Sequence, residues 1–510
     1  MNNAIFMYDL PKNEPILGYL PCSLERKELE KEIQRLSSEV IEIPLIIGGK
    51  EIYTGNLGEV VMPHNHSHVL GTYHKAGEKE VKMAIDAALE AHSYWTNVSW
   101  VERMSVTLKI AELISKKYRA LLNAATMLGQ SKNIYQAEID CVCETIDFLR
   151  FNAYYISEVY NHQPFSESGC INRLEYRPLE GFIFTVSPFN FTSIASNLNM
   201  SPVLMGNTVV WKPASTAILS NYVLMKIYKE AGLPDGVINF LPGQGSFIGN
   251  IVLNHRDLAG VHFTGSTATF NEFWKTISHN IGHYRSYPKL VGETGGKDFV
   301  FLHSSADIDE AATALIRGAF EYQGQKCSAA SRAYVPRSIW PSLKDKMLGM
   351  LHEIKIGDPT NYENFVNAVI DEASFNKIMH YIDYAKGSKE AEIIWGGKGD
   401  KSVGYFVDPT IIFTSNPHFL TMEEEIFGPV LTVYIYEDDQ FDETLRLCDQ
   451  TSPYALTGAV FSKDREALNH ACRVLRYAAG NFYFNYKPTG AVVGQQPFGG
   501  SRSSGTNDKA

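Results

Sequence analysis

The sequence predicts an α/β protein with two parallel-sheet lobes and a β-hairpin that serves oligomerisation. Two observations indicate this fold class. Short β-rich runs alternate with helical runs at residues 181–302, and a second alternating series extends over residues 333–484. Such alternation implies right-handed βαβ crossovers and therefore parallel sheets. With 510 residues, 45% of them hydrophobic, the chain can build two or three packed domains.

The expected elements follow in chain order. Residues 77–160 read as successive amphipathic helices, as in the spacing of Val81, Ile85 and Ala88. Residues 161–180 contain alternating residues such as Ile171, Arg173 and Glu175, and this pattern predicts an exposed hairpin. The runs GFIFTVS, NTVVWKP, GVINFLP, GVHFTGS and DFVFL predict the first sheet, and AYVP, IIWGG, PVLTVYIY, TGAVFS and GNFYFN predict the second. No proline-rich linker separates the lobes, so we expect a cleft between tightly joined lobes.

Charge and hydropathy exclude several function classes. The formal net charge of -11 argues against nucleic acid as a partner, because phosphate backbones are bound mainly by clustered Lys and Arg. The longest apolar runs fall short of the ~20 residues that span a bilayer, so no membrane association is expected. The first 23 residues show neither a secretory nor an import pattern, which predicts a cytoplasmic protein.

The cysteine and histidine patterns do not predict a metal site. Seven cysteines without CxxC spacing fit a reducing compartment. Cys141 and Cys143 are two apart in a predicted helix, where their side chains face different directions. His64, His66 and His68 alternate as in a strand, which would put three imidazoles on one face, but no carboxylate or cysteine supports them. We therefore expect no bound metal.

The run EYQGQKCS contains the strongest candidate for a nucleophile. Cys327 follows a glycine-containing turn at the end of a helical run and stands beside Lys326. Lys326 and nearby backbone amides are expected to favour the thiolate, which is the reactive form. A cysteine in such a place is more often structural when it stands alone, because buried free cysteine is common.

Six further motifs accompany Cys327. They are SPFNFT at Asn190, WKPA at Lys212, FTGS at Gly265, GETGGK at Glu293, EEIFGPV at Glu425 and PFGG at Phe498. Over residues 46–505 the chain resembles the aldehyde dehydrogenase superfamily in these motifs and in their order. The resemblance implies an aldehyde dehydrogenase-like fold with two Rossmann-like lobes, and the oxidation of an aldehyde with NAD.

The residue types also suit this chemistry. Oxidation by hydride transfer needs a tetrahedral centre that can expel hydride, and a soft nucleophile such as Cys327 forms one by adding to the carbonyl carbon. The resemblance implies that the side chain of Asn190 and the backbone N–H of Cys327 hold the oxyanion. It also implies that Glu293, with a raised pKa, is the base that activates water for thioester hydrolysis.

The cofactor is expected at the junction of a strand and a helix. Backbone amides and the helix dipole near Gly265 can hold a pyrophosphate. With the residues that the resemblance adds, the expected NAD-binding set is Ser187, Lys212, Gly265, Ser266, Thr267, Ala268, Thr269, Glu425 and Phe427. Ser215 lacks the charge that repels a 2′-phosphate in many NAD-specific relatives, so NADP is a weaker alternative. Gly243 and Gly245 lack the third glycine of a dinucleotide fingerprint and are predicted to form a turn.

Several motifs narrow the resemblance to one branch, the 1-pyrroline-5-carboxylate dehydrogenases. These are SPFNFT, EYQGQKCSA and the run over residues 480–509. The branch oxidises L-glutamate γ-semialdehyde, which equilibrates with 1-pyrroline-5-carboxylate, to L-glutamate in proline degradation. The resemblance implies that Ser328 and the backbone of Gly490 and Ala491 bind the α-carboxylate, while Phe191 and Phe498 flank the aliphatic chain.

The same resemblance sets the expected domains and partners. Residues 1–160 and 181–292 are assigned to the NAD-binding domain, 161–180 to the oligomerisation hairpin, 293–484 to the catalytic domain, and 485–510 to a substrate-anchor loop with a truncated C-terminal segment. We expect a homodimer or a higher homo-oligomer, and a separate proline dehydrogenase is a further candidate partner. The alternatives are an aldehyde dehydrogenase for another semialdehyde or a neutral aldehyde, and an inactive family member that acts as a scaffold.

Overall fold

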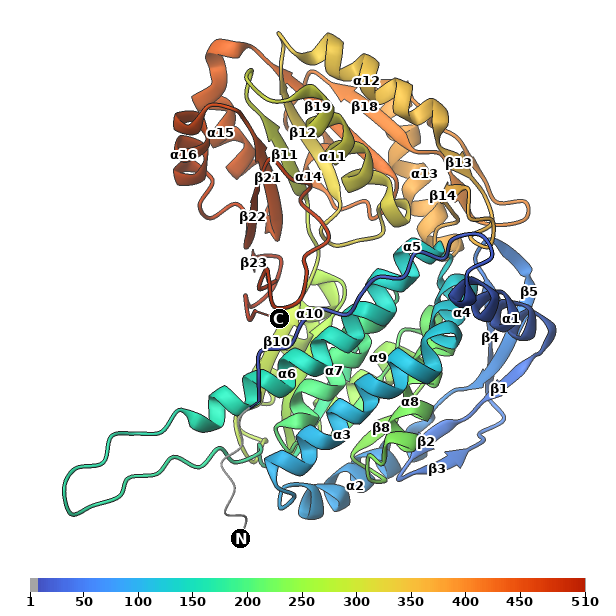
Figure 1. The fold of residues 1–510 in the computed structure, drawn as a ribbon, viewed down its shortest axis with the longest axis vertical. Helices are drawn as coiled ribbons and strands as arrows, with labels where there is room; N and C mark the ends of the chain where they lie inside the picture. Colours follow the sequence, from blue (N-terminus) through green and yellow to red (C-terminus); the bar gives the residue numbers. More distant parts are fainter. Residues whose placement is uncertain (1–7, 510) are drawn as a thin grey trace.

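The computed structural model describes residues 8–509, and Figure 1 shows two α/β lobes. Residues 1–7, on which part of the compartment prediction rests, lie outside the described residues, as does Ala510. Each lobe contains a seven-stranded sheet, and helices pack on the sheets. The α/β class with two mainly parallel sheets is confirmed. None of the described helices is long and apolar enough to cross a membrane.

The first sheet has the order β10-β9-β6-β7-β8-β2-β3. Its parallel strands are β6 (Phe182–Val186), β7 (Val209–Lys212), β8 (Ile238–Phe240), β9 (Leu258–Thr264) and β10 (Lys289–Glu293). The helices between them are α7 (Thr192–Leu204), η3 (Ser215–Ala217), α8 (Ile218–Ala231), α9 (Gly245–Leu253) and α10 (Thr267–His279). Two antiparallel strands, β2 (Leu45–Ile47) and β3 (Lys50–Ile52), extend one edge.

A helical layer packs against this lobe, as the amphipathic pattern predicts. It consists of α2 (Glu78–Trp95), α3 (Trp100–Leu113), η1 (Ile114–Tyr118), α4 (Arg119–Gln130), α5 (Ile134–Ala137), η2 (Glu138–Cys143) and α6 (Glu144–Asn161). The buried face of α4 includes Leu122, Met127 and Leu128, which join the core of the first lobe. Because apolar side chains recur at helical spacing, one face of each helix can be buried there.

The sequence analysis missed a small sheet near the N-terminus. Helix α1 (Leu24–Ser38) precedes three strands, β1 (Ile41–Ile43), β4 (Leu57–Met62) and β5 (Asn65–His74), in the order β1-β5-β4. His64 is buried in the turn before β5, and burial lowers its pKa to about 4. Within residues 8–509 no cluster of three or more potential ligands is placed to hold a metal ion.

The second sheet has the order β15-β18-β19-β12-β11-β21-β22. Its strands are β11 (Asp298–Leu302), β12 (Ala330–Pro336), β15 (Ala391–Trp395), β18 (Thr410–Thr414), β19 (Val430–Tyr436), β21 (Thr457–Phe461) and β22 (Asn481–Phe484). The prediction that DFVFL ends the first sheet is wrong, because this run, β11, pairs with β12 and β21 at the centre of the second sheet. The local pattern of residues does not indicate which distant strand a given strand pairs with.

Helices and short strands complete the second lobe. The helices are α11 (Ile308–Phe320), η4 (Glu321–Gly324), α12 (Trp340–Glu353), α13 (Glu372–Gly387), α14 (Leu420–Glu423), η5 (Asp438–Gln440), α15 (Phe441–Gln450) and α16 (Arg465–Val474). The short strands are β13 (Lys355–Ile356), β14 (Asn364–Val366), β16 (Gly399–Asp400), β17 (Phe406–Val407), β20 (Tyr454–Ala455) and β23 (Ser501–Arg502). The sequence analysis did not identify β18 or α13.

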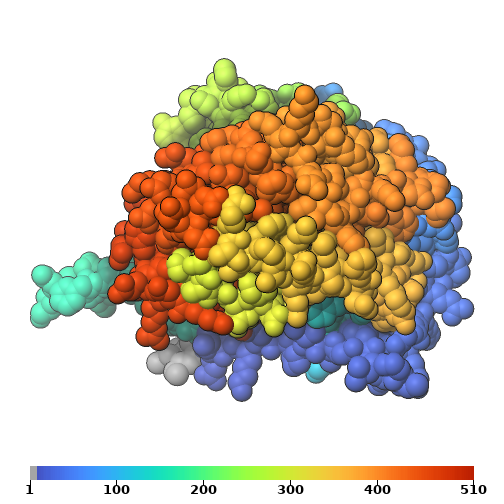
Figure 2. All heavy atoms as spheres, turned by 90° about the horizontal axis from the view of Figure 1, so that it is seen from above, coloured from blue at the N-terminus to red at the C-terminus, as the bar shows by residue number. Residues whose placement is uncertain are grey.

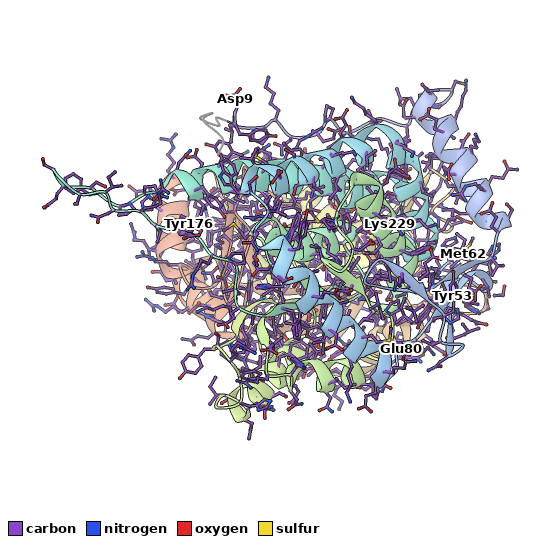
Figure 3. All side chains as sticks on the ribbon, turned by 90° about the horizontal axis from the view of Figure 1, so that it is seen from below. Asp9, Tyr53, Met62, Glu80, Tyr176 and Lys229 are labelled. Atoms are coloured by element: carbon purple, nitrogen blue, oxygen red, sulfur yellow. The ribbon has the colours of Figure 1, made fainter. Side chains whose placement is uncertain are left out.

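Residues 162–178 form an arm that projects from the first lobe (Figures 1 and 2). Its two halves run side by side, but no β-ladder joins them, so the expected strands of the hairpin are absent from the arm. Side-chain bonds hold it instead, such as Leu174 N–H to Gln163 Oε1 at 2.9 Å. A lone pair of strands has no apolar face to bury and is only marginally stable. Tyr176 lies near the root of the arm (Figure 3), where its ring packs on Tyr160.

Candidate active site

Cys327 lies where two cavities meet. The smaller cavity, of about 190 Å³, is lined by Cys327, Glu293 and Ser328 among others. The larger, of about 740 Å³, reaches Cys327 from the first lobe and is lined also by Asn190 and Gly265. A group bound in one cavity can therefore react at the sulfur with a group bound in the other.

A strained turn presents Cys327. After α11 ends, Tyr322, Gln323 and Gly324 all adopt positive φ, at 50°, 56° and 65°. Non-glycine residues pay roughly 1–3 kcal/mol each for such conformations, so the surrounding structure must hold them. The Gln323 side chain is buried and donates to the carbonyl of Ala368 at 2.8 Å. At Gly324 a Cβ would lie 2.2 Å from the carbonyl oxygen of Gly428, which explains the glycine.

The expectation that Lys326 favours the thiolate is wrong. The Lys326 ammonium instead pairs with Asp140 at 2.9 Å, in the helical layer. Burial, together with Glu293 and further nearby carboxylates, raises the pKa of the Cys327 thiol well above its usual range. The fold turns the Lys326 side chain towards a different charge, whereas a backbone hydrogen bond from Ser328 lowers the pKa of Cys327 in part, as expected for a nearby backbone amide.

Asn190 and Glu293 belong to the first lobe, and each lines one of the two cavities that share Cys327. Asn190 follows β6, is buried, and donates one amide hydrogen to the carbonyl of Gln325 at 3.0 Å. The second hydrogen of that amide can serve an oxyanion. Glu293 ends β10, and its Oε1 is buried without a hydrogen-bond partner among the described residues. Burial raises the pKa of Glu293 to about 7, so the carboxyl group can exchange a proton near neutral pH.

The larger cavity collects most of the expected cofactor residues. Seven of them line it: Ser187, Lys212, Gly265, Ser266, Thr269, Glu425 and Phe427. Thr267 and Ala268 belong to the first turn of α10 and do not line the cavity. Ser266 is the N-cap of α10, and its hydroxyl accepts from Thr269 N–H at 3.3 Å. The free amides at this helix end suit a pyrophosphate.

Electrostatics and shape further define the larger cavity. Burial lowers the pKa of Lys212 to about 8. A Glu425 carboxylate oxygen accepts from Gly296 N–H at 2.9 Å, and burial raises the pKa of Glu425. Phe427 has a positive φ of 62°, an uncommon conformation for a bulky residue, and its ring packs edge-on against Phe189 at 5.8 Å. This geometry fixes an aromatic face in the cavity.

All five expected substrate residues line the smaller cavity. They are Phe191, Ser328, Gly490, Ala491 and Phe498. The last three lie in or near residues 489–496, which we call the anchor loop. Its first residue, Thr489, bonds to the Ser328 hydroxyl at 2.8 Å, and Gly490 has a positive φ of 86°. The loop and the nucleophile segment are thus joined beside Cys327.

Sequence reasoning missed several residues of the two cavities. Glu144, the first residue of α6, lines the smaller cavity and accepts from the Ser193 hydroxyl at 2.8 Å. Burial and Asp140 raise the pKa of Glu144 to about 8. Gly245, which was predicted to form a turn with Gly243, lines the larger cavity at the start of α9, and so does Ser246. Glu144 stands in a helical stretch that also contains Glu138, Asp140 and Asp147, so no local pattern distinguished it.

Comparisons with known proteins agree with this geometry. The chain matches the aldehyde dehydrogenase family over residues 53–510. It is 53% identical over 503 residues to the mitochondrial delta-1-pyrroline-5-carboxylate dehydrogenase of Dictyostelium discoideum, covering 98% of this chain and 90% of that protein. A probable delta-1-pyrroline-5-carboxylate dehydrogenase of Schizosaccharomyces pombe is 50% identical, covering 99% of this chain and 94% of that protein.

A solved structure is similar over the whole chain. The delta-pyrroline-5-carboxylate dehydrogenase from Mycobacterium tuberculosis, bound with NAD, has a TM-score of 0.96 and 48% sequence identity. The match covers 100% of this chain and 94% of that one. The matched family and the similar fold therefore agree with each other. The chain belongs to the aldehyde dehydrogenase family.

Proposed function

We propose that this protein oxidises L-glutamate γ-semialdehyde to L-glutamate with NAD. The observation that carries the proposal is that Cys327 lines both cavities, one suited to a small acid and the other to a dinucleotide. Relatives at 53% and 50% identity are named delta-1-pyrroline-5-carboxylate dehydrogenases, which supports the substrate.

The smaller cavity has complementary groups for an amino acid semialdehyde. The anchor loop offers the backbone N–H groups of Gly490 and Ala491, and Ser328 offers a hydroxyl, to an α-carboxylate. Glu144 offers a carboxylate to an α-ammonium group, and a bound cation would lower its raised pKa. Phe191 and Phe498 leave room for a short aliphatic chain between these groups and Cys327.

The first chemical step forms a bond to sulfur. Cys327 loses its proton, and the thiolate adds to the aldehyde carbon to give a thiohemiacetal oxyanion. The Asn190 amide and the Cys327 backbone N–H donate to that oxygen; losing one such donor typically costs about 3 kcal/mol. Because burial opposes the thiolate, the proton must pass to a base such as Glu293, whose pKa of about 7 suits the task.

The second step releases the acid. Bound NAD supplies the acceptor for the hydride that leaves the thiohemiacetal carbon. A thioester on Cys327 remains. Glu293 releases to solvent the proton that it took from Cys327, and its carboxylate then removes a proton from water as the water oxygen attacks the thioester carbon. The carbon–sulfur bond then breaks, which returns the Cys327 thiolate and gives L-glutamate.

The residues of the larger cavity fit a dinucleotide. The amides at the start of α10 suit a pyrophosphate, Lys212 and Glu425 suit ribose hydroxyls, and Phe427 suits a flat ring. Ser215 also lines this cavity and carries no charge, so NADP is expected to bind more weakly rather than to be rejected.

The assembly and the compartment are predicted on separate grounds. We propose a homodimer or a higher homo-oligomer joined through the arm, because Phe165 and Ile171 are 81% and 88% exposed there. A cytoplasmic location stays a prediction, and the relative from Dictyostelium discoideum is named mitochondrial. A separate proline dehydrogenase stays a predicted partner.

One assay tests the substrate and the coenzyme together. NADH formation is measured with glutamate semialdehyde, succinate semialdehyde and propionaldehyde, and the best aldehyde is measured again with NADP. We expect the largest kcat/KM for glutamate semialdehyde with NAD. A larger kcat/KM for either of the other aldehydes would overturn the substrate proposal. Cys327→Ala is the matched control, and turnover by that variant would refute nucleophilic catalysis by Cys327.

A further inference from the structure

An extended N-terminal segment joins the smaller cavity to the helical layer. Residues 13–19, which we call the strap, form neither helix nor strand. Figure 1 shows this dark blue stretch running across α6 towards α5 and α1. Asn13, Glu14 and Ile16 line the same cavity as Cys327 and Gly490. The strap is therefore part of the wall of the proposed substrate site, although no sequence motif marks it.

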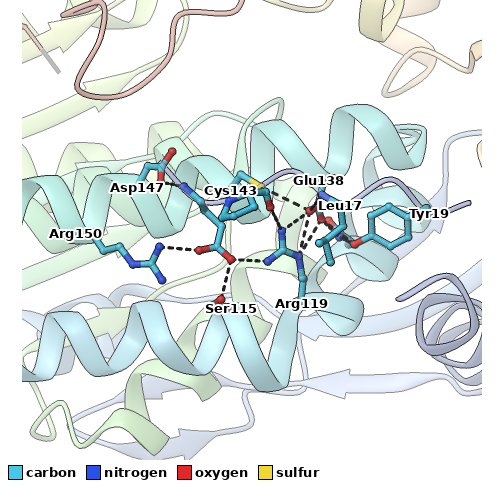
Figure 4. Close-up of polar contacts among 11 residues, drawn as sticks. Leu17, Tyr19, Ser115, Arg119, Glu138, Cys143, Asp147 and Arg150 are labelled. Carbon is cyan, nitrogen blue, oxygen red and sulfur yellow. Dashed lines mark hydrogen bonds and ion pairs between the residues drawn. The ribbon is translucent and has the colours of Figure 1, made fainter. Parts of the chain in front are cut away.

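Charged groups fix the strap to the helices at Glu14. Its carboxylate pairs with Arg119 and with Arg150, each at 2.6 Å, and accepts from the Ser115 hydroxyl at 2.8 Å (Figure 4). These partners belong to the helical layer: Ser115 lies in η1, Arg119 in α4 and Arg150 in α6. They hold the pKa of Glu14 below its usual value despite partial burial. A carboxylate with three such partners has a fixed position.

Glu138 holds the other end of the strap. Its carboxylate accepts from Leu17 N–H at 2.9 Å and from the Tyr19 hydroxyl at 2.8 Å, and it also pairs with Arg119 (Figure 4). Glu138 and Tyr19 are buried. The strap is thus anchored to the helical layer at two places, which makes it a rigid support rather than a loose tail.

Asn13 connects this support to the anchor loop. Its Nδ2 donates to Asp147 on α6 at 2.9 Å and to the carbonyl of Val493 at 2.8 Å. Its Oδ1 accepts from Gln495 Nε2 at 2.8 Å. Both hydrogens of the amide and its oxygen are therefore used. Asp147 is fixed in turn by Glu14 N–H at 2.7 Å.

We propose that Asn13 is a positioning residue for substrate binding. Through Val493 and Gln495 it fixes the anchor loop, so that the backbone N–H groups of Gly490 and Ala491 face the α-carboxylate of the substrate. The inference rests on the proposed function and deepens it. Asn13 acts on the end of the site that binds the carboxylate. Its loss should therefore raise KM for aldehydes that carry an α-carboxylate and leave the chemical step at Cys327 unchanged.

The test compares Asn13→Ala with the wild-type protein on two aldehydes. Two bonds to the loop are lost, so we expect KM for glutamate semialdehyde to rise about tenfold with kcat within about twofold. For propionaldehyde, which has no carboxylate, kcat/KM should change by no more than about twofold. Asn97→Ala is the matched control, because Asn97 is exposed and, among the residues that the structure describes, its side-chain amide bonds only to the carbonyl of Ser93, at 2.8 Å.

Amide hydrogen exchange adds a measurement that needs no substrate. In Asn13→Ala the amides of residues 490–496 should exchange faster than in the wild type, while those of β12 and β19 should not change. Equal losses on both aldehydes, an unchanged KM, or unchanged exchange in the loop would each overturn the role of Asn13. If the wild type does not prefer glutamate semialdehyde, the proposed function fails by itself, and loop exchange still decides whether Asn13 fixes the loop.

Discussion

At the scale of single residues, burial sets the chemistry of the site. The Cys327 thiol is surrounded by carboxylates that oppose its ionisation, and Glu293 has a raised pKa because its carboxyl group is buried. A neutral thiol and a carboxyl group that titrates near neutral pH form a pair that can exchange a proton during each turnover. Both groups must therefore be considered together when activity is measured against pH.

Glu293→Gln should abolish steady-state turnover and slow the first step. We expect kcat to fall by about 10²-fold or more, because water is no longer deprotonated. The burst of NADH from the first turnover should also be slower than in the wild type, because Glu293 takes the Cys327 proton in the first step. Stopped-flow absorbance of NADH measures both. A burst followed by an unchanged steady-state rate would contradict the role of Glu293.

The pH profile of the wild type follows from the same pKa. The ionised carboxylate is the active base, and its pKa is raised to about 7, so the protonated form dominates at lower pH. We expect kcat to fall about tenfold per pH unit below about pH 6.5 and to level off above about pH 8. The profile is measured with saturating substrate. A kcat that stays constant across this range would show that Glu293 does not limit the rate.

Glu144→Gln tests the partner proposed for the α-ammonium group. Removing the negative charge should raise KM for glutamate semialdehyde about tenfold, because a charge-assisted bond is lost. Succinate semialdehyde has no ammonium group, so its KM should stay the same or fall. The ratio of the two KM values is the measurement. An equal rise for both aldehydes would indicate a structural role for Glu144.

At the scale of elements, irregular segments position the reactive groups. The turn over residues 321–324 leads into the segment that carries Cys327, and residues of the anchor loop and of the strap line the cavity of Cys327. Buried hydrogen bonds hold them in conformations that local propensity disfavours. The arm is the opposite case, since few contacts hold it and its apolar side chains face outwards.

Charging the arm should weaken self-association. In the double variant Phe165→Asp and Ile171→Asp, a contact through the arm would bury two carboxylates. The oligomer should therefore dissociate at a higher protein concentration than the wild type does. Sedimentation velocity measures the mass over a range of concentrations. Val403→Asp is the matched control, because Val403 is also exposed but lies in the second lobe. An unchanged mass in the double variant would rule out the arm as the interface.

At the scale of the whole molecule, the two lobes share one site. The larger cavity is lined by residues of the first lobe, such as Lys212 and Gly265, and by Glu425 and Phe427 of the second. The segment between β10 and β11 passes from one sheet to the other beside Cys327. A ligand in this cavity contacts both lobes and therefore stabilises the folded molecule as a unit.

NAD should raise the thermal midpoint of the protein in the absence of an aldehyde. At a concentration of 100 times Kd, binding contributes about 2.7 kcal/mol. We expect a smaller shift with an equal concentration of NADP and almost none with NAD in Lys212→Ala. Cys327→Ala should retain the full shift, because Cys327 is not needed to hold the cofactor. Differential scanning fluorimetry measures the four shifts: the wild type with NAD, the wild type with NADP, and each of the two variants with NAD. Equal shifts with NAD for the wild type and Lys212→Ala would exclude a cofactor role for Lys212.

The sequence by itself determined the fold class and the residues of the proposed chemistry. Alternating apolar runs predicted β6 to β9, because strands between crossover helices are buried on both faces, whereas β10 was not predicted. The motifs around Cys327, Asn190 and Glu293 predicted residues that the structure brings to adjoining cavities. These signals are local, since each depends on residue types at short spacing.

Only the tertiary structure decided which distant groups meet. It moved β11 into the second sheet, left the arm without a ladder, and turned Lys326 towards Asp140, 186 positions earlier in the chain. It also placed Asn13 against Val493 and Gln495. Strand pairing, desolvation and charge pairing depend on distances between segments, and a local pattern carries no such distances.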